Sequence, residues 1–104
     1  ALRPISVDGE AGVRLLNAAA LLKEHFPPAH IVAGLSNISF GLPARSWINR
    51  TFAVLALCHG VDTFILDPCD RKLMASLLSG QAVLNQDQYC RRFLAAYRGG
   101  KLGD

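Results

Sequence analysis

The sequence contains few charged residues, no long apolar run and only three cysteines. Of its 104 residues, 18% are charged and 51% are hydrophobic, and the formal net charge is +3. So high an apolar content excludes a disordered chain, which buries too little surface to offset the entropy lost on ordering. No apolar stretch approaches the roughly 18 residues that indicate a membrane span, so we expect no membrane partner.

The sequence lacks the motifs of several common catalytic and metal-binding sites. The cysteines Cys58, Cys69 and Cys90 are odd in number and too widely spaced for a zinc site. Reduced thiols, no metal site and a cytoplasmic location are therefore expected. The sequence has neither a G-x-S-x-G nucleophile motif nor a phosphate-binding glycine loop. The aromatics near the C-terminal arginines recur every four residues, which favours helix packing over contact with nucleic acid.

Helical patterns alternate with short apolar runs, which predicts an α/β fold with parallel strands. We expect the end of a strand at 2–7, helices at 9–26, 43–59, from 70 onward and at 87–97, and a polar tail at 99–104. The runs 31–35 and 63–66 should be strands buried on both faces. Pro43 suits the first position of the second helix, and Gly60 suits the residue after its end.

The carboxyl ends of parallel strands are where α/β proteins bind ligands, and three polar residues follow these strands. They are Ser36 and Asn37 after the first strand and Asp67 after the second. Local roles are also open, because Asn37 can start a turn and Asp67 can cap one. Arg45, in the first turn of the second helix, is either solvated surface or a contact for an anionic ligand.

Three blocks of residues resemble one protein family. They are Gly34–Arg45 (GLSNISFGLPAR), Ile48–Phe52 (INRTF) and Gly60–Pro68 (GVDTFILDP). They resemble the pterin-binding barrel of methyltetrahydrofolate:corrinoid methyltransferases, a family that includes the folate domain of cobalamin-dependent methionine synthase. The resemblance implies a (β/α)₈ TIM barrel, which needs about 250 residues. Residues 1–98 would then be its C-terminal part, from the end of strand six to helix eight.

The resemblance also implies roles for individual residues. Asn37 would hydrogen-bond the pterin nitrogen N5 and stabilise charge as the methyl group moves, since an amide has no pKa useful for acid catalysis. Asn37 is thus the expected catalytic residue. The resemblance implies that Gly34, Ser36, Arg45 and Ile65 bind substrate, and Asp67 joins them because it follows the second strand. Methyltetrahydrofolate would donate the methyl group to the cobalt of a corrinoid (cobalamin) carried by a partner protein or domain. The chain alone should be inactive, because the family's pterin-anchoring Asp and Asn residues lie on earlier strands.

The same sequence is also compatible with two other functions. The chain could be a free-standing small α/β protein with a binding or structural role and an inherited fold. A synthase like dihydropteroate synthase is disfavoured, because Asn37 and Ile38 stand where that family has Arg and Lys. If the chain is part of a methyltransferase, the rest of the barrel or another copy of the chain should cover the exposed strand edges.

Overall fold

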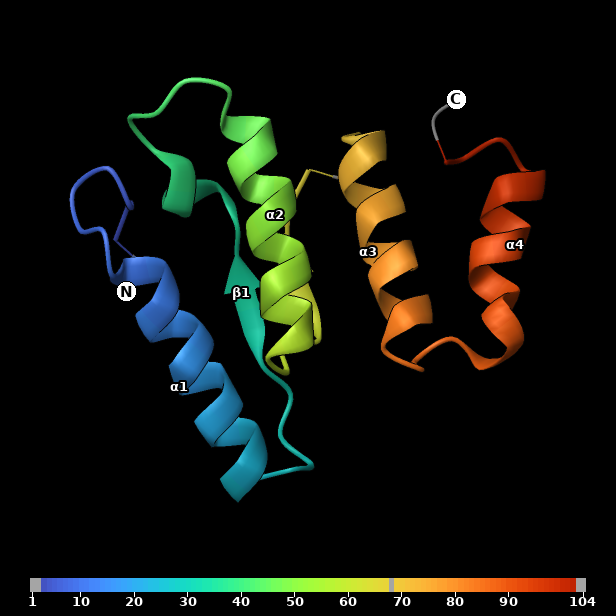
Figure 1. Cartoon of the computed structure of the whole chain (residues 1–104), viewed down its shortest axis with the longest axis horizontal. Coiled ribbons are helices and arrows are strands. Elements are labelled where there is room, and N and C mark those ends of the chain that lie inside the picture. Colours follow the sequence, from blue (N-terminus) through green and yellow to red (C-terminus); the bar gives the residue numbers. More distant parts are fainter. Residues whose placement is uncertain (1–2, 68, 103–104) are drawn as a thin grey trace. The chain divides into compact units, whose positions relative to one another are not determined.

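The computed structural model describes residues 3–67 and 69–102, which form a small α/β protein with two parallel strands (Figure 1). The helices are α1 (Ala11–His25), α2 (Arg45–Cys58), α3 (Arg71–Val83) and α4 (Arg91–Arg98). The strands are β1 (Val32–Gly34) and β2 (Thr63–Ile65), and the 3₁₀ turns are η1 (Ser36–Ser39) and η2 (Gln88–Cys90). The chain divides into two compact units, of which the first ends at residue 66 and the second begins at residue 67.

The first unit packs α1 and α2 against the sheet. Strands β1 and β2 pair in parallel, with Val32 opposite Thr63 and Gly34 opposite Ile65. One core joins these elements through small side chains, which let the backbones approach closely. Its buried members are Ala19, Ala33, Ala56 and Val61.

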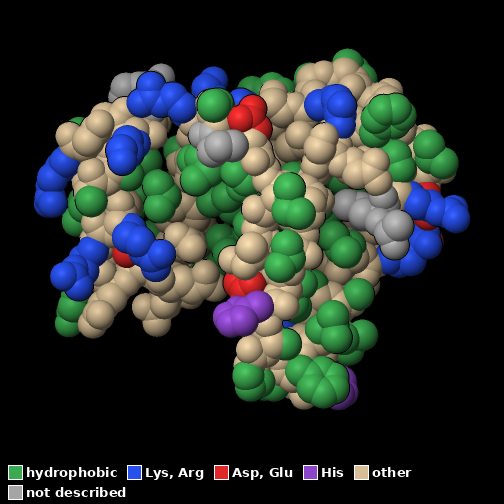
Figure 2. All heavy atoms as spheres, turned by 180° about the vertical axis from the view of Figure 1, so that it is seen from behind, with side chains coloured by type: hydrophobic (Ala, Val, Ile, Leu, Met, Phe, Trp, Pro, Cys, Tyr) green, Lys and Arg blue, Asp and Glu red, His purple; other side chains and the backbone are tan. Residues whose placement is uncertain are grey.

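The two strands are covered on one face only, where Ala33 is buried and Phe64 is half-buried, which corrects the prediction that both faces are buried. Ala33 is 8% exposed, whereas Val32 is 58% exposed and Ile65 is 71% exposed. Successive side chains of a strand point to opposite faces, and α1 and α2 pack against the face that holds Ala33. Hydrophobic side chains also reach the surface in the view from behind the molecule (Figure 2).

The predicted strand end at 2–7 is wrong over its described part. Residues 5–7 form a turn, because Pro4 O accepts from the backbone N–H groups of Val7, at 3.1 Å, and Asp8, at 3.0 Å. One extended contact remains, from Ile5 N to Ile38 O at 3.0 Å. Leu2 lies outside the described residues. A single hydrogen bond to a distant segment does not form a β-ladder, so residues 3–7 form no strand.

Helix α2 ends as predicted and starts later than predicted. Gly60 has a φ of +103°, Gly60 N donates to Leu57 O at 3.2 Å, and Val61 N donates to Ala56 O at 3.0 Å. This pair of bonds is the Schellman motif that glycine favours. At the other end Ala44 has a φ of +52°, a left-handed conformation, so the helix begins at Arg45 and Pro43 lies outside it.

The second unit contains α3 and α4, and an aspartate precedes each helix. The Asp70 side chain accepts from Leu73 N at 3.0 Å, which confirms the predicted start of α3. Asp87 accepts from Arg92 N and Phe93 N, both at 3.0 Å, and these bonds hold the pKa of its carboxyl below the ordinary value. The predicted helix at 87–97 is therefore a 3₁₀ turn followed by α4. None of the helices in the described part of the chain is long and apolar enough to cross a bilayer.

Candidate functional site

The end of the sheet brings together several of the predicted site residues. Leu35 N donates to Ile65 O at 3.3 Å, so the pairing extends one residue past β1. The chain then turns at once into η1, which carries Ser36 and Asn37, both exposed. Gly34 and Ile65 are exposed neighbours in register. Gly34, Ser36, Asn37 and Ile65 therefore lie at the carboxyl end of the two strands.

Arg45 joins this cluster from the first turn of α2. Its Nη2 donates to the carbonyl oxygen of Ser36, and at 3.0 Å to the hydroxyl of the same residue. The guanidinium carbon also lies 5.7 Å from the centre of the Phe40 ring. Arg45 is thus bonded to the turn that carries Asn37 and is not a solvated surface residue.

Two further residues, which no local sequence pattern indicated, complete this network. Ser39 is 0% exposed. Its hydroxyl donates to Asn49 Oδ1 at 2.7 Å and accepts from Arg45 Nε at 3.0 Å. Both residues lie in the sequence blocks that carry the resemblance, which is the one signal that could have drawn attention to them.

The segment before α1 holds the other side of η1. Ser6 Oγ donates to Phe40 O at 2.7 Å, and Ile5 N donates to Ile38 O. Gly41 follows with a φ of +85°, and a Cβ there would lie 3.1 Å from Ser6 Oγ. The turn is therefore held by backbone and side-chain bonds on two sides.

Asp67 begins the second unit, whereas the other predicted residues lie in the first. Its Oδ1 accepts from Cys69 N at 2.9 Å, across Pro68, which lies outside the described residues. An aspartate that bonds the backbone two residues later forms an Asx turn. Asp67 therefore stabilises the local turn, which is one of the two roles that the sequence left open.

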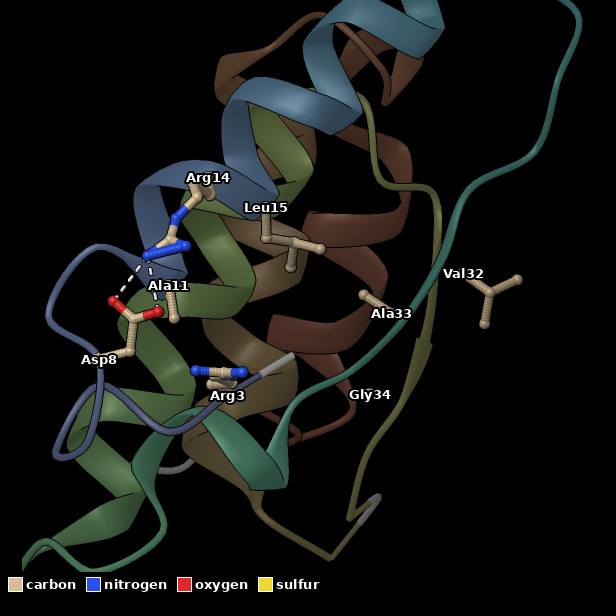
Figure 3. Close-up of a pocket in the computed structure, with 8 residues that line it drawn as sticks. All are labelled: Arg3, Asp8, Ala11, Arg14, Leu15, Val32, Ala33 and Gly34. Atoms are coloured by element: carbon tan, nitrogen blue, oxygen red, sulfur yellow. Dashed lines mark hydrogen bonds and ion pairs between the residues drawn. The ribbon is translucent and has the colours of Figure 1, made fainter. Parts of the chain in front are cut away.

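An open pocket of about 470 Å³ lies between β1 and the start of α1 (Figure 3). Gly34 is the predicted site residue in its lining. On the opposite wall Arg14 Nη2 donates to both carboxylate oxygens of Asp8, at 2.7 and 2.6 Å. These bonds hold the pKa of Asp8 below its usual value. Ala33 points toward Leu15, whereas Val32 points away from it (Figure 3).

The polar groups at the site are hydroxyls, amides and one guanidinium. Among the residues hydrogen-bonded around η1, Arg45 carries the charge, and a guanidinium suits an anionic or carbonyl-bearing ligand. In the described ranges 3–67 and 69–102, no three His, Cys, Asp or Glu side chains gather closely enough to hold a metal ion.

Comparison with known proteins identifies a relative. No family model matches the chain. It is, however, 43% identical over 82 residues to the methylcorrinoid:tetrahydrofolate methyltransferase of Eubacterium limosum. The chain is homologous to part of this methyltransferase. The match covers 79% of the chain and 30% of the relative's length. The homology supports the resemblance found in the sequence, and two parallel strands with flanking helices are consistent with part of a barrel.

Proposed function

We propose that this chain forms the C-terminal part of a pterin-binding barrel that moves a methyl group between tetrahydrofolate and a corrinoid. The observation that carries the proposal is the position of Ser36 and Asn37, in a turn directly after a parallel strand. Ligand sites of parallel α/β proteins lie at this end of the strands. The homology to a methyltransferase supplies the class of reaction.

The exposed face of the sheet supports the barrel. In a (β/α)₈ barrel the helices cover the outside of the sheet, and side chains of all eight strands fill the inside. Here α1 and α2 pack on one face, and the other face exposes Val32 and Ile65. The remaining strands, supplied by the rest of the polypeptide or by a second copy, would cover this face and its edges.

The chemistry assigns one role to Asn37. Transfer from a methylcorrinoid breaks the carbon–cobalt bond, leaves its electron pair on cobalt, forms the N5–carbon bond and releases the N5 proton. The reverse transfer, from methyltetrahydrofolate to cobalt(I), passes through the same transition state. An amide at N5 stabilises the charge and the proton position in that state, in either direction.

The neighbours of Asn37 would bind the pterin. A Cβ at Gly34 would meet no atom within 4 Å, so this backbone is open to a flat ring. Ser36 offers a hydroxyl, Ile65 an exposed apolar side chain and Arg45 a guanidinium donor. A partner protein or domain in the cytoplasm would carry the corrinoid. The 104 residues alone would not catalyse methyl transfer.

The test uses the full-length protein that carries this sequence, with methylcobalamin as methyl donor and tetrahydrofolate as acceptor. Asn37→Ala should lower kcat by about 100-fold or more, the scale for loss of one donor at developing charge. Asn17→Ala, which removes an exposed amide from α1, is the matched control and should keep the wild-type rate.

Two results would contradict the proposal. An Asn37→Ala protein with wild-type methyl transfer would remove the assigned role of this residue. A full-length protein that neither transfers the methyl group nor binds methyltetrahydrofolate in isothermal titration would favour a binding or structural protein with an inherited fold.

A further inference from the structure

The most deeply buried polar side chain of the first unit belongs to a residue without an assigned role. Ser39 is 0% exposed, two residues after Asn37. Its hydroxyl accepts from Arg45 Nε at 3.0 Å and donates to Asn49 Oδ1 at 2.7 Å. Ser39 Oγ also lies 3.3 Å from Ser36 O, so the hydroxyl touches both ends of the turn and two positions of α2.

Arg45 and Asn49 lie four residues apart on α2, which places them on one face of a rigid helix. Arg45 reaches Ser36, before Asn37, and Asn49 reaches Ser39, after it. The turn that carries Asn37 is therefore held at both ends by one helix face. The backbone from which the Asn37 side chain extends is therefore fixed on both sides.

We infer that Ser39 and Asn49 are positioning residues, which hold the backbone of Asn37 at the place where N5 reacts. The inference rests on the proposed function and extends it to two residues to which that function assigns no contact with a substrate. Small displacements of a reacting group lower rates steeply, by about 100-fold for roughly 1 Å. Loss of the Ser39 hydroxyl would let Arg45 and the turn shift together.

A double-mutant cycle in the full-length protein tests this inference, with methyl transfer from methylcobalamin as the readout. Ser39→Ala should lower kcat by about tenfold to 100-fold in the wild-type background. In the Asn37→Ala background it should change kcat by less than about twofold, because residues that act through one group are not additive. If Ser39 had a merely structural role, Ser39→Ala would lower kcat by the same factor in both backgrounds. Equal factors would overturn the inference.

Substitutions at Asn49 provide an independent check should Ser39→Ala not fold. Asn49→Asp keeps an oxygen that accepts from Ser39, whereas Asn49→Leu has a similar volume and no acceptor. Asn49→Asp should keep kcat within about threefold of wild type, and Asn49→Leu should match the loss in Ser39→Ala. Equal rates in the two variants would also overturn the inference.

The controls separate this inference from the proposed function. Ser46→Ala removes an exposed hydroxyl from the same helix and should leave kcat unchanged. If Asn37→Ala is slow but Ser39→Ala is not, the positioning role fails and the proposed function stands. If Asn37→Ala keeps the wild-type rate, both fail.

Discussion

Nδ1 of His30 lies 2.8 Å from Oδ2 of Asp62, and this contact joins the amino ends of β1 and β2. A carboxylate only accepts hydrogen bonds, so His30 is the donor. Asp62 Oδ1 also accepts from Ile31 N at 3.1 Å, and Lys23 Nζ lies 3.6 Å from Oδ2. Asp62 thus connects α1 and both strands at the end of the sheet opposite to the candidate site.

The first prediction concerns the pH dependence of this contact. The hydrogen bond from His30 is the largest cause that lowers the pKa of Asp62 below its ordinary value. A depressed carboxyl pKa stabilises the fold above the unfolded pKa, about 3.9, and this contribution is lost as pH falls through the lower folded-state pKa. The midpoint of urea unfolding should therefore fall in acid, and less steeply in Asp62→Asn.

Trp47 is the single tryptophan and lies on α2, so its fluorescence reports unfolding of the first unit. Glu24→Gln removes an exposed carboxylate from α1 and should keep the wild-type pH profile. Parallel profiles for the wild type and Asp62→Asn would show that Asp62 contributes nothing to the acid sensitivity.

The second prediction concerns Arg45. Arg45→Lys should lower the free energy of unfolding by about 1–3 kcal/mol, because buried Ser39 loses its Nε donor and a single ammonium cannot reproduce the guanidinium geometry. Arg3→Lys, at an exposed position of the same unit, should stay within about 0.5 kcal/mol of wild type. Equal urea midpoints for the two variants would mean that the Arg45 network adds no stability.

The third prediction concerns the end of α2. Gly60→Ala should cost about 1–2 kcal/mol, because its φ of +103° suits only glycine and the new Cβ would lie 3.0 Å from Lys23 Cγ. Gly9→Ala is the control, since its Cβ would meet nothing within 4 Å, and it should change stability by under about 0.5 kcal/mol. Thermal unfolding of both variants by circular dichroism measures the difference.

The fourth prediction concerns the exposed face of the sheet. If further strands cover this face in the full-length protein, Val32→Asp buries an unpaired carboxylate there and should abolish soluble expression. In the 104-residue chain Val32 is 58% exposed, so the same change should leave the helical circular dichroism signal intact. Val13→Asp, on the exposed side of α1, is the control for both proteins. Soluble, folded full-length Val32→Asp would argue against the barrel.

Features that depend on neighbouring residues were predictable from the sequence. The apolar runs became the parallel strands, and helices and strands alternate as predicted from α1 to α3, although the expected strand end at 2–7 did not form. Asp70 caps α3 and Gly60 follows the end of α2, because a side-chain acceptor and a left-handed φ act within one turn of helix. The placement of Ser36 and Asn37 after β1 also followed, since parallel strands end at one edge.

Features that depend on distant contacts were not predictable in this way. The partners of Arg45 and the burial of Ser39 require α2 to lie against η1, which no local pattern encodes. The left-handed Ala44 displaced the start of α2 from Pro43, and bonds to Pro4 O turned the expected strand end into a turn. The sequence by itself determined the alternation of helices with two parallel strands and the resemblance to the methyltransferases. Only the tertiary structure decided which sheet face is covered and which residues hold the Asn37 turn, because burial and hydrogen-bond partners arise when distant segments pack.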